Sequence, residues 1–432
     1  MRSSLVLSVL FLAGCAAAQP ASTDAPPPDR PRNVILMIAD GFGPASATLG
    51  AAAKGAPLAL DSVLVGSVET SATDSRVTDS AAGATAYACG IKTYNGAIGV
   101  AEGGAPCRTV LEAAEARGMG TGLVATSRIT HATPASFASH VPSRAEEAEI
   151  ARQLAASGVE VLFGGGRTYF AGLTDAMAAD GWAVATDRAG YDALDATPAA
   201  ALLADDHLAY EVDRDDTDQP SLAELTTTAL DLLAASEDGR QRGFFLLVEG
   251  SRIDHAGHAN DPAAHVGDIL AYDAAVAAAL AWAAADGQTL VVSTADHETG
   301  GMTLGRDGLY AWDPAPLLAV GASFEALTAA VEALGPDDDP AEVVRRALGR
   351  DALDDATADA LRGAVASGDP AALTALVRDL ESVPAGIGWT TGGHTAVDVG
   401  LYAFGPGAGR FAARMANDAV GRALFDALGL ER

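Results

Sequence analysis

The chain has 432 residues, of which 49% are apolar, and 27 basic against 57 acidic side chains give it a formal charge of −30 at pH 7. An apolar fraction of this size supplies a sizeable buried core and excludes a globally disordered chain. The acidic balance argues against nucleic acid as a partner, because a surface of this sign repels phosphate backbones. Chemistry on an anionic small molecule would therefore need a local source of positive charge.

The first 14 residues are typical of an export signal. Arg2 precedes an apolar run, residues 5–13, that is too short for a membrane span of about 20 residues. The run ends at Cys15 in the tetrapeptide LAGC, which is similar to the cleavage motif of bacterial lipoproteins. We therefore expect a lipoprotein signal peptide at 1–14, a lipid on Cys15, and an exported protein held on a bacterial membrane, in the periplasm or at the cell surface. An ordinary signal peptide with an incidental cysteine is the alternative.

Residues 15–32 are rich in proline and small polar residues, and they have too little apolar surface to fold, so we expect a Pro-rich tether. Two cysteines follow, Cys89 and Cys107. In an oxidising compartment they would form a disulfide that closes a loop of about 17 residues and contributes roughly 3 kcal/mol. Two buried thiols are the alternative, and the sequence leaves both open.

Short apolar runs alternate with alanine-rich helical stretches along the chain. Most of the runs are continuous rather than alternating, which is typical of strands covered on both faces. Strand–helix alternation predicts an α/β fold, a three-layer sandwich with a largely parallel central sheet. The predicted strands are Val34–Ala39, Gly122–Thr126, Val159–Phe163, Phe244–Val248, Thr289–Thr294 and Val397–Phe404, and the predicted helices are Arg108–Arg117, Arg144–Ala156, Leu222–Ala235 and Pro262–Ala285.

Residues 302–388 interrupt this alternation with helical patterns, which predicts a helical insertion before the last strands. Ser323 is a candidate N-cap, and Asp339 and Asp369 each precede a proline, as at the first turn of a helix. The insertion either packs against the sheet core or serves as a lid or an oligomer contact.

Acids and histidines gather where the predicted strands end, which is where open α/β sheets bind their ligands. Asp254 and His258 are four residues apart, so they face the same way on a helical turn. Carboxylate with neutral imidazole favours zinc, and a site with fewer than four protein ligands leaves room for water or substrate. The residues concerned are Asp40, Glu249, Asp254, His255, His258, Asp296, His297 and His394.

Two further residues suggest chemistry on a phosphate. Ser80 falls near the start of a helix-prone run, where the positive end of the helix dipole favours a serine alkoxide or a bound phosphate; an N-cap serine is the plainer interpretation. Arg144 offers a planar fork that matches two phosphate oxygens, and a surface salt bridge is its ordinary alternative.

Taken together, six ordered motifs between about residues 33 and 425 resemble the alkaline phosphatase family. The motifs are DGFG from Asp40, TDSAA from Thr78, HATP from His131 with Ser143-Arg144, VEGSRIDHAGH from Val248, TADH from Thr294 and GHT from Gly393. The resemblance implies one alkaline phosphatase-like domain over 33–432, and it is weakest in the insertion.

The resemblance also implies a role for each motif residue. Ser80 would be the nucleophile that becomes phosphoserine, Arg144 would clamp the phosphate, and His131 and His255 would lie near it. Two Zn²⁺ and one Mg²⁺ would be bound, with His131 favouring Zn²⁺ in the third site. The implied ligands are Asp254, His258 and His394 for one zinc, Asp40, Asp296 and His297 for the other, and Asp40, Thr133 and Glu249 for magnesium.

The predicted function is metal-dependent hydrolysis of small phosphomonoesters through a phosphoserine, releasing inorganic phosphate, in an enzyme that could form a homodimer. A related phosphodiesterase or sulfatase is the close alternative, and a non-catalytic lipoprotein that binds metal or phosphate is the distant one. His140, His207 and His265 match no ligand motif, and we interpret them as structural or surface residues.

Overall fold

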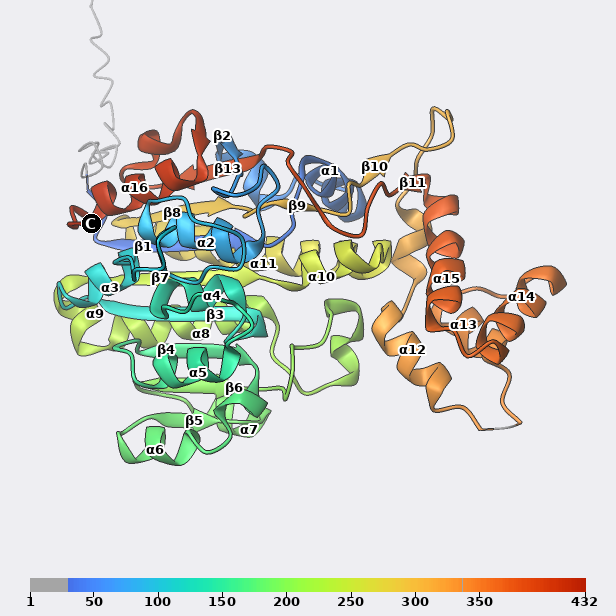
Figure 1. The fold of residues 1–432 in the computed structure, drawn as a ribbon, viewed down its shortest axis with the longest axis horizontal. Helices are drawn as coiled ribbons and strands as arrows, with labels where there is room; N and C mark the ends of the chain where they lie inside the picture. Colours follow the sequence, from blue (N-terminus) through green and yellow to red (C-terminus); the bar gives the residue numbers. More distant parts are fainter. Residues whose placement is uncertain (1–29, 336) are drawn as a thin grey trace, which may run out of the picture.

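The computed structural model describes residues 30–335 and 337–432. The predicted signal peptide, Cys15 and the tether up to residue 29 lie outside the described residues, so they stay predictions. The remaining chain is built around one large sheet with helices on both sides, and four helices of the C-terminal half stand apart from that sheet (Figure 1).

The central sheet has ten strands in the order β14-β2-β13-β8-β1-β7-β3-β4-β6-β5. β13 runs antiparallel to both of its neighbours, and the other pairings in the sheet are parallel. The strands are β1 Asn33–Ala39, β2 Leu64–Glu69, β3 Gly120–Arg128, β4 Val161–Gly165, β5 Ala183–Ala185, β6 Ala199–Leu202, β7 Phe244–Gly250, β8 Thr289–Thr294, β13 Val399–Phe404 and β14 Arg414–Ala416.

All six predicted strands are confirmed as β1, β3, β4, β7, β8 and β13; β8 has the predicted ends, and the ends of the other five are shifted by a few residues. Every residue of β1, β7 and β8 is buried, which explains why their apolar runs are continuous. The sequence missed the strands nearer the edges. β6 is three alanines and a leucine, a composition that favours helix until pairing with β4 and β5 imposes the strand.

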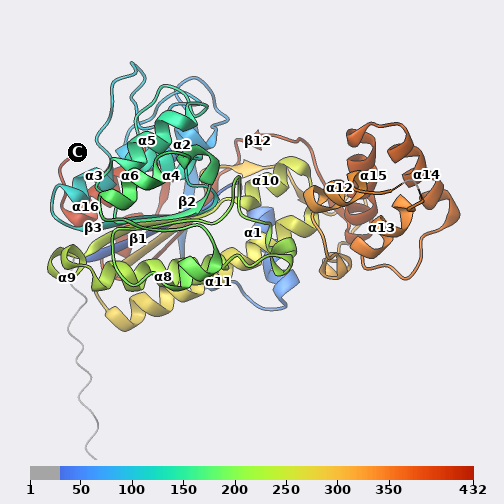
Figure 2. The same cartoon turned by 90° about the horizontal axis from the view of Figure 1, so that it is seen from below.

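Helices cover both faces of the sheet, as the sandwich prediction requires (Figure 2). α8 and α11 lie along one face, and α2, α4, α5 and α16 lie on the other. By length and hydropathy α11 resembles a membrane span, yet it packs on β1, β7 and β8 as a core helix. These helices are α1 Pro44–Lys54, α2 Ser80–Cys89, α3 Val110–Glu115, α4 Ala132–Ala138, α5 Glu147–Ala155, α6 Thr174–Ala179, α7 Arg188–Asp192, α8 Leu222–Ala235, α9 Glu237–Arg242, α10 Arg252–Ala259, α11 Pro262–Asp286 and α16 Asn417–Leu428.

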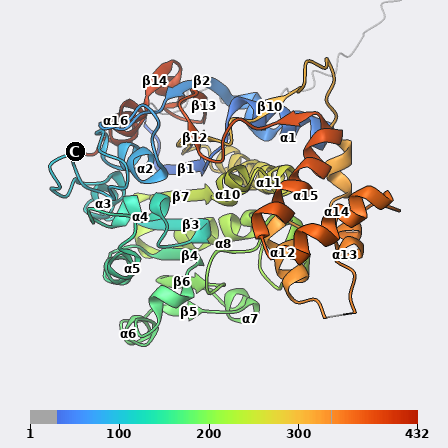
Figure 3. The same cartoon turned by 45° about the vertical axis from the view of Figure 1, so that its right-hand side comes forward.

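The four helices of the insertion pack together at one end of the molecule (Figure 3). They enclose a hydrophobic cluster that includes the buried Val344, Leu361 and Val377. These helices are α12 Phe324–Glu332, α13 Pro340–Ala347, α14 Asp355–Ala366 and α15 Pro370–Ala385, and the short strands β10 Thr303–Leu304 and β11 Ile387–Gly388 pair at the base of the insertion. Ser323, Asp339 and Asp369 are the N-caps of α12, α13 and α15, as predicted from their side chains and, for the two aspartates, from the following prolines.

Of the two alternatives for the cysteines, the structure shows the disulfide. Cys89, the last residue of α2, is bonded to Cys107 in the segment before α3. The bond ties the C-terminal end of the helix that begins at Ser80 to the chain that follows it.

Candidate metal centre and active site

Three neighbouring strands bring acidic residues to one edge of the sheet. β1 lies between β8 and β7, and its Ile38 pairs with Thr294 of β8 and Glu249 of β7, so the three strands end at the same level. Asp40 follows directly after β1, and Asp296 comes two residues after the end of β8. The parallel topology therefore gathers carboxylates that are more than 200 residues apart in the sequence.

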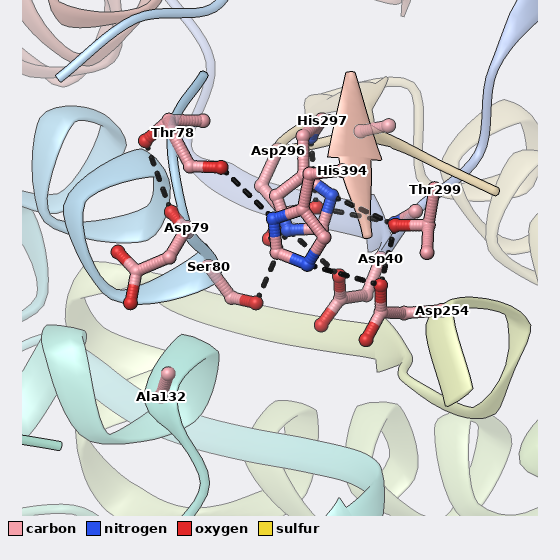
Figure 4. Close-up of polar contacts among 12 residues, drawn as sticks. Asp40, Thr78, Asp79, Ser80, Ala132, Asp254, Asp296, His297, Thr299 and His394 are labelled. Atoms are coloured by element: carbon pink, nitrogen blue, oxygen red, sulfur yellow. Dashed lines mark hydrogen bonds and ion pairs between the residues drawn. The ribbon is translucent and has the colours of Figure 1, made fainter. Parts of the chain in front are cut away.

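A helix and a short strand pair bring the remaining predicted ligands to the same edge. Asp254 and His258 share a face of α10, and His258 Nε2 lies 3.4 Å from Asp254 Oδ2. His394 lies on β12 (His394–Thr395), which pairs with β9 (Glu298–Thr299) in such a way that His394 stands opposite Thr299. This pairing places His394 beside His297, with the two rings stacked at 3.5 Å between centroids (Figure 4).

The first candidate metal group consists of Asp40, Asp296 and His297, and all three are fully buried. His297 Nε2 lies 3.4 Å from Asp40 Oδ1 and 3.2 Å from Asp296 Oδ2. Both oxygens of Asp40 and Oδ2 of Asp296 have no hydrogen-bond partner among the described residues. Buried carboxylate oxygens are rarely left unpaired without a bound ion, so this group fits a cation.

The protonation of these acids supports the same conclusion. Burial, together with the charge of Asp296, raises the pKa of Asp40 well above its usual range, and burial raises the pKa of Asp296 to about 8. Neutral carboxyl groups would remove the repulsion between them, but a bound cation removes it while leaving both charged. The same donor set is one that zinc prefers.

The second candidate group consists of Asp254, His297 and His394. His258, which the sequence predicted as a ligand together with Asp254 and His394, lies beside this group, with its Nε2 3.4 Å from Asp254 Oδ2. His258 Nδ1 donates to the Gly392 carbonyl at 2.7 Å, and His394 Nδ1 donates to the Thr78 carbonyl at 2.9 Å. In its neutral form each imidazole has one N–H, and with Nδ1 donating, each Nε2 has a lone pair; the two Nε2 atoms lie 3.0 Å apart. Such lone pairs repel unless a cation accepts both, and a backbone carbonyl on Nδ1 is the usual support of a metal-bound histidine.

The third candidate group consists of Asp40, His131 and Glu249. Burial raises the pKa of Glu249 to about 7, and its Oε1 has no partner among the described residues, while Oε2 accepts from Ser251 at 2.6 Å. His131 Nδ1 and the Thr133 hydroxyl are also buried without a partner in the described part of the chain. These oxygens suit a hard cation such as Mg²⁺, and a His131 nitrogen suits zinc once it carries no hydrogen.

Ser80 is the first residue of α2, and its side chain is 1% exposed. The preceding residue, Asp79, is the N-cap, because its carboxylate accepts from the Ala82 N–H at 3.0 Å. The serine is therefore not the capping residue that its sequence also allowed. Its hydroxyl instead lies 3.2 Å from His297 Nε2, at the edge of the first metal group (Figure 4).

Arg144, the predicted phosphate clamp, contacts the residue that precedes Ser80. Its Nη1 donates to Asp79 Oδ2 at 3.1 Å and its Nη2 donates to His131 Nε2 at 3.0 Å. The guanidinium is thus held by the residue that caps the Ser80 helix and by a histidine of the third candidate group. It is about 30% exposed, so one side remains open to a ligand.

Next to Arg144, three histidine rings pack together. His131 meets His255 at 5.4 Å and His207 at 5.6 Å between ring centroids, and His207 meets His255 at 4.3 Å. Burial and nearby positive groups lower the pKa of His131 and His255 well below the usual value and that of His207 to about 3, so the rings are neutral.

His207 was interpreted from the sequence as a structural or surface residue, and the structure places it inside this cluster. It follows β6, a strand that the sequence did not reveal, so no sequence signal located it. His140 and His265 do have structural contacts: His140 bonds Glu112 at 2.7 Å, and the buried His265 bonds Ser46 at 2.9 Å.

Two residues that the sequence did not single out support the ligands. Thr299 donates from its hydroxyl to Asp254 Oδ1 at 2.5 Å and lies 3.2 Å from His297 Nδ1 (Figure 4). Gly41 has a φ of +77°, and a Cβ there would lie 2.7 Å from the Asp254 Cα. A side chain at Gly41 would therefore push α10 away from the end of β1.

Comparisons with known proteins agree with this site over nearly the whole chain. A family model described as "Alkaline phosphatase" matches residues 31–430. A repressible alkaline phosphatase of Saccharomyces cerevisiae is 40% identical, covering 86% of this chain and 76% of its own. Alkaline phosphatase 3 of Bacillus subtilis is 37% identical, covering 93% and 89%.

Solved structures show the same fold. The cold-active alkaline phosphatase of a psychrophilic Shewanella sp. superposes with a TM-score of 0.85 at 35% identity, over 92% of this chain and 99% of its own. The Thermus thermophilus alkaline phosphatase superposes with a TM-score of 0.83 at 31% identity, over 96% of each chain.

Proposed function

This chain belongs to the alkaline phosphatase family and hydrolyses phosphate monoesters, and we propose that it does so with Ser80 as the nucleophile. The observation that carries this assignment is the buried Ser80 hydroxyl, which lies 3.2 Å from His297 Nε2 beside unpartnered carboxylate oxygens. A serine in an ordinary core would be surrounded by satisfied groups.

We propose that the three candidate groups hold two Zn²⁺ and one Mg²⁺, with Zn²⁺ as the alternative in the third because His131 contributes a nitrogen. When bound, such cations neutralise the charges of the phosphate and of the attacking and departing oxygens, and they lower the pKa of water. Asp40 belongs to two of the groups, so it would link them.

The protein's own residues orient the reaction. With Asp79 as the N-cap, the positive end of α2 meets the Ser80 oxygen, which favours its anionic form. The Ser80 oxygen attacks phosphorus, the bond to the departing oxygen breaks, and phosphoserine forms. Water then attacks phosphorus, which releases inorganic phosphate and restores Ser80.

Arg144 would bind the phosphate throughout this cycle. Its guanidinium is held in place by Asp79 and His131, and a planar fork can donate to two phosphate oxygens. His131 and His255 would line the same pocket as neutral donors or acceptors. This grouping supplies the local positive charge that an acidic protein needs for an anionic substrate.

The test is turnover of p-nitrophenyl phosphate by the wild type, Ser80→Ala and, as a control, Ser367→Ala at an exposed site in the insertion. We expect Ser80→Ala to lose at least about a thousandfold in kcat. After incubation with radioactive phosphate at acidic pH, we expect the wild type to carry the label on Ser80. Full activity of Ser80→Ala would rule out this nucleophile. Rates on a diester and a sulfate ester test the related activities.

We also propose that the enzyme is exported and anchored through a lipid on Cys15. The apolar run before LAGC supports this, and so does the Cys89–Cys107 disulfide, because such bonds persist in oxidising compartments. A Cys15→Ser variant should leave the membrane fraction and lose incorporation of labelled fatty acid. The homodimer also remains a proposal, which light scattering of the purified protein would test.

A further inference from the structure

The helical insertion is fastened to the main body where α12 begins. The backbone N–H of Phe324 donates to the buried carboxylate of Asp261 at 2.7 Å. The next residue, Glu325, accepts a hydrogen bond from Arg252 Nη2 at 2.7 Å. Arg252 is the first residue of α10, the helix that carries Asp254 and His258, so the insertion contacts the helix that supplies two predicted metal ligands.

Arg252 is held on three sides. Its side chain is only 3% exposed, and the guanidinium stacks on the ring of Tyr210 at 3.6 Å. One arm of the fork donates to Glu325, and the other, Nη1, donates to His255 Nδ1 at 3.0 Å. A carboxylate from the insertion and an imidazole of the active site therefore share a single guanidinium.

This contact fixes which nitrogen of His255 carries the proton. A guanidinium has N–H donors and no acceptor, so His255 Nδ1 must accept, and the neutral ring carries its hydrogen on Nε2. Arg252 thereby holds both the tautomer and the orientation of the ring. Arg252 therefore determines that His255 can donate to an anion from Nε2, and Arg252 is itself hydrogen-bonded to Glu325 of the insertion.

The contacts continue from His255 to the nucleophile. His255 packs edge to face against His131, whose Nε2 accepts from Arg144. Arg144 in turn bonds Asp79, the N-cap of the Ser80 helix. Adjacent side chains thus connect an exposed residue of the insertion with the predicted phosphate pocket.

We propose that Glu325 is a positioning residue for phosphate binding, which acts through Arg252 on the tautomer and orientation of His255. This inference rests on the proposed role of His255 and Arg144 in binding phosphate. Without the Glu325 carboxylate, the Arg252 guanidinium loses one of its two side-chain hydrogen bonds and can rotate on the Tyr210 ring. His255 can then take its other tautomer, and the phosphate loses a donor.

The variant that tests this is Glu325→Gln, with Glu332→Gln as the matched control. Glu332 is an exposed glutamate at the other end of α12. We expect Glu325→Gln to raise KM for p-nitrophenyl phosphate and Ki for inorganic phosphate about three- to tenfold, with a smaller change in kcat. The side chain of Glu325 is 69% exposed, so the melting temperature should stay with that of the wild type.

Nitrogen-15 spectra of labelled histidine provide a readout that does not depend on turnover. In the wild type, His255 should show an unprotonated Nδ1 and a protonated Nε2, and Glu325→Gln should move both signals toward the average of exchanging tautomers. Unchanged signals together with unchanged KM and Ki would overturn the proposal, and so would an equal rise in KM for Glu332→Gln.

A double-mutant cycle separates positioning from general support of the fold. If Glu325 acts through His255, Glu325→Gln should have no further effect on the phosphate Ki in a His255→Asn background. An undiminished effect there overturns the proposal. Absence of monoester turnover in the wild type would instead overturn the proposed function, and the nitrogen spectra would then decide the coupling of Glu325 to His255 alone.

Discussion

At the carboxyl edge of the sheet, several buried polar atoms face one another without partners, whereas most charged side chains of the insertion are exposed. Glu381 of α15, which is 3% exposed and has no partner for Oε2 among the described residues, is an exception. Asp40 has two oxygens without a partner among the described residues, at zero exposure. In the insertion, Arg362 reaches both Asp339 and Asp359 at the surface, and the helices carry capping side chains. Unsatisfied buried groups are costly, so their concentration at one edge marks the place where a ligand completes the structure.

The helices of the insertion, by contrast, pack largely on one another. Most of their buried apolar residues form a separate cluster, and their ion pairs are largely exposed ones, several at i,i+3 or i,i+4 spacing, which contribute little to stability. The insertion's link to function runs through particular contacts, notably Glu325. The comparison therefore predicts that charge changes at the sheet edge abolish activity, while charge changes in the body of the insertion do not.

The largest difference should come from Asp40→Asn, because Asp40 belongs to two of the candidate metal groups. We expect kcat on p-nitrophenyl phosphate to fall about a thousandfold and the bound zinc to decrease, since loss of even an outer partner of a metal ligand costs about 10–100-fold. Asp359→Asn, an exposed carboxylate of the insertion, is the control and should keep wild-type activity. A variant of Asp40 with more than a tenth of wild-type kcat and full zinc would contradict the assignment.

A second test changes a buried apolar residue of the insertion instead of a charged one. Leu361 is fully buried there, so Leu361→Ala should lower the free energy of unfolding by about 3 kcal/mol. At a temperature where the variant is folded, kcat and KM should stay at wild-type values, because Leu361 is not part of the contact to Arg252. Urea unfolding and steady-state kinetics measure both quantities.

Leu247→Ala in β7, equally buried, is the matched core change beside the site. A folded Leu361→Ala enzyme with reduced kcat would show that the insertion core does more than support α12.

The sequence allowed prediction of much of the fold because burial on both faces leaves an unambiguous pattern. Both ends of β8 were predicted correctly. All six of its residues are buried in the sheet, so its run of strand-forming residues is continuous. The caps of α12, α13 and α15 were equally clear, because serine and aspartate before a helix act locally. β6 was missed because its alanines are placed in a strand by their neighbours and not by their own preference.

The site divides in the same way. Residues within two positions of a strand end, such as Asp40 and Asp296, were found because parallel strand ends converge. Thr299 and His207 were missed because they come near the site only through the β9–β12 pairing and the loop after β6. Arg252 and Glu325 are 73 residues apart, and the sequence around neither residue predicts their hydrogen bond.

The smallest expected effect concerns how stability depends on pH when the metals are removed. Burial raises the pKa of Asp296 to about 8 and that of Glu249 to about 7, above their values in the unfolded chain. Below about pH 4 these groups are protonated in both states. As the pH rises toward 8 the unfolded chain loses these protons while the native chain keeps them, so the free energy of unfolding falls, by roughly 2 kcal/mol once the metal-free site relaxes and admits water. With Zn²⁺ and Mg²⁺ bound, the carboxylates are already ionised in the native protein, and this fall should disappear.

Urea unfolding at pH 5, 6, 7 and 8, with a chelator or with both metals, measures how the free energy of unfolding depends on pH in each state. The difference between the two states isolates the site, because other buried acids such as Asp268 contribute equally to both. Parallel curves would mean that the unpartnered carboxylates at the sheet edge are not where the metals bind.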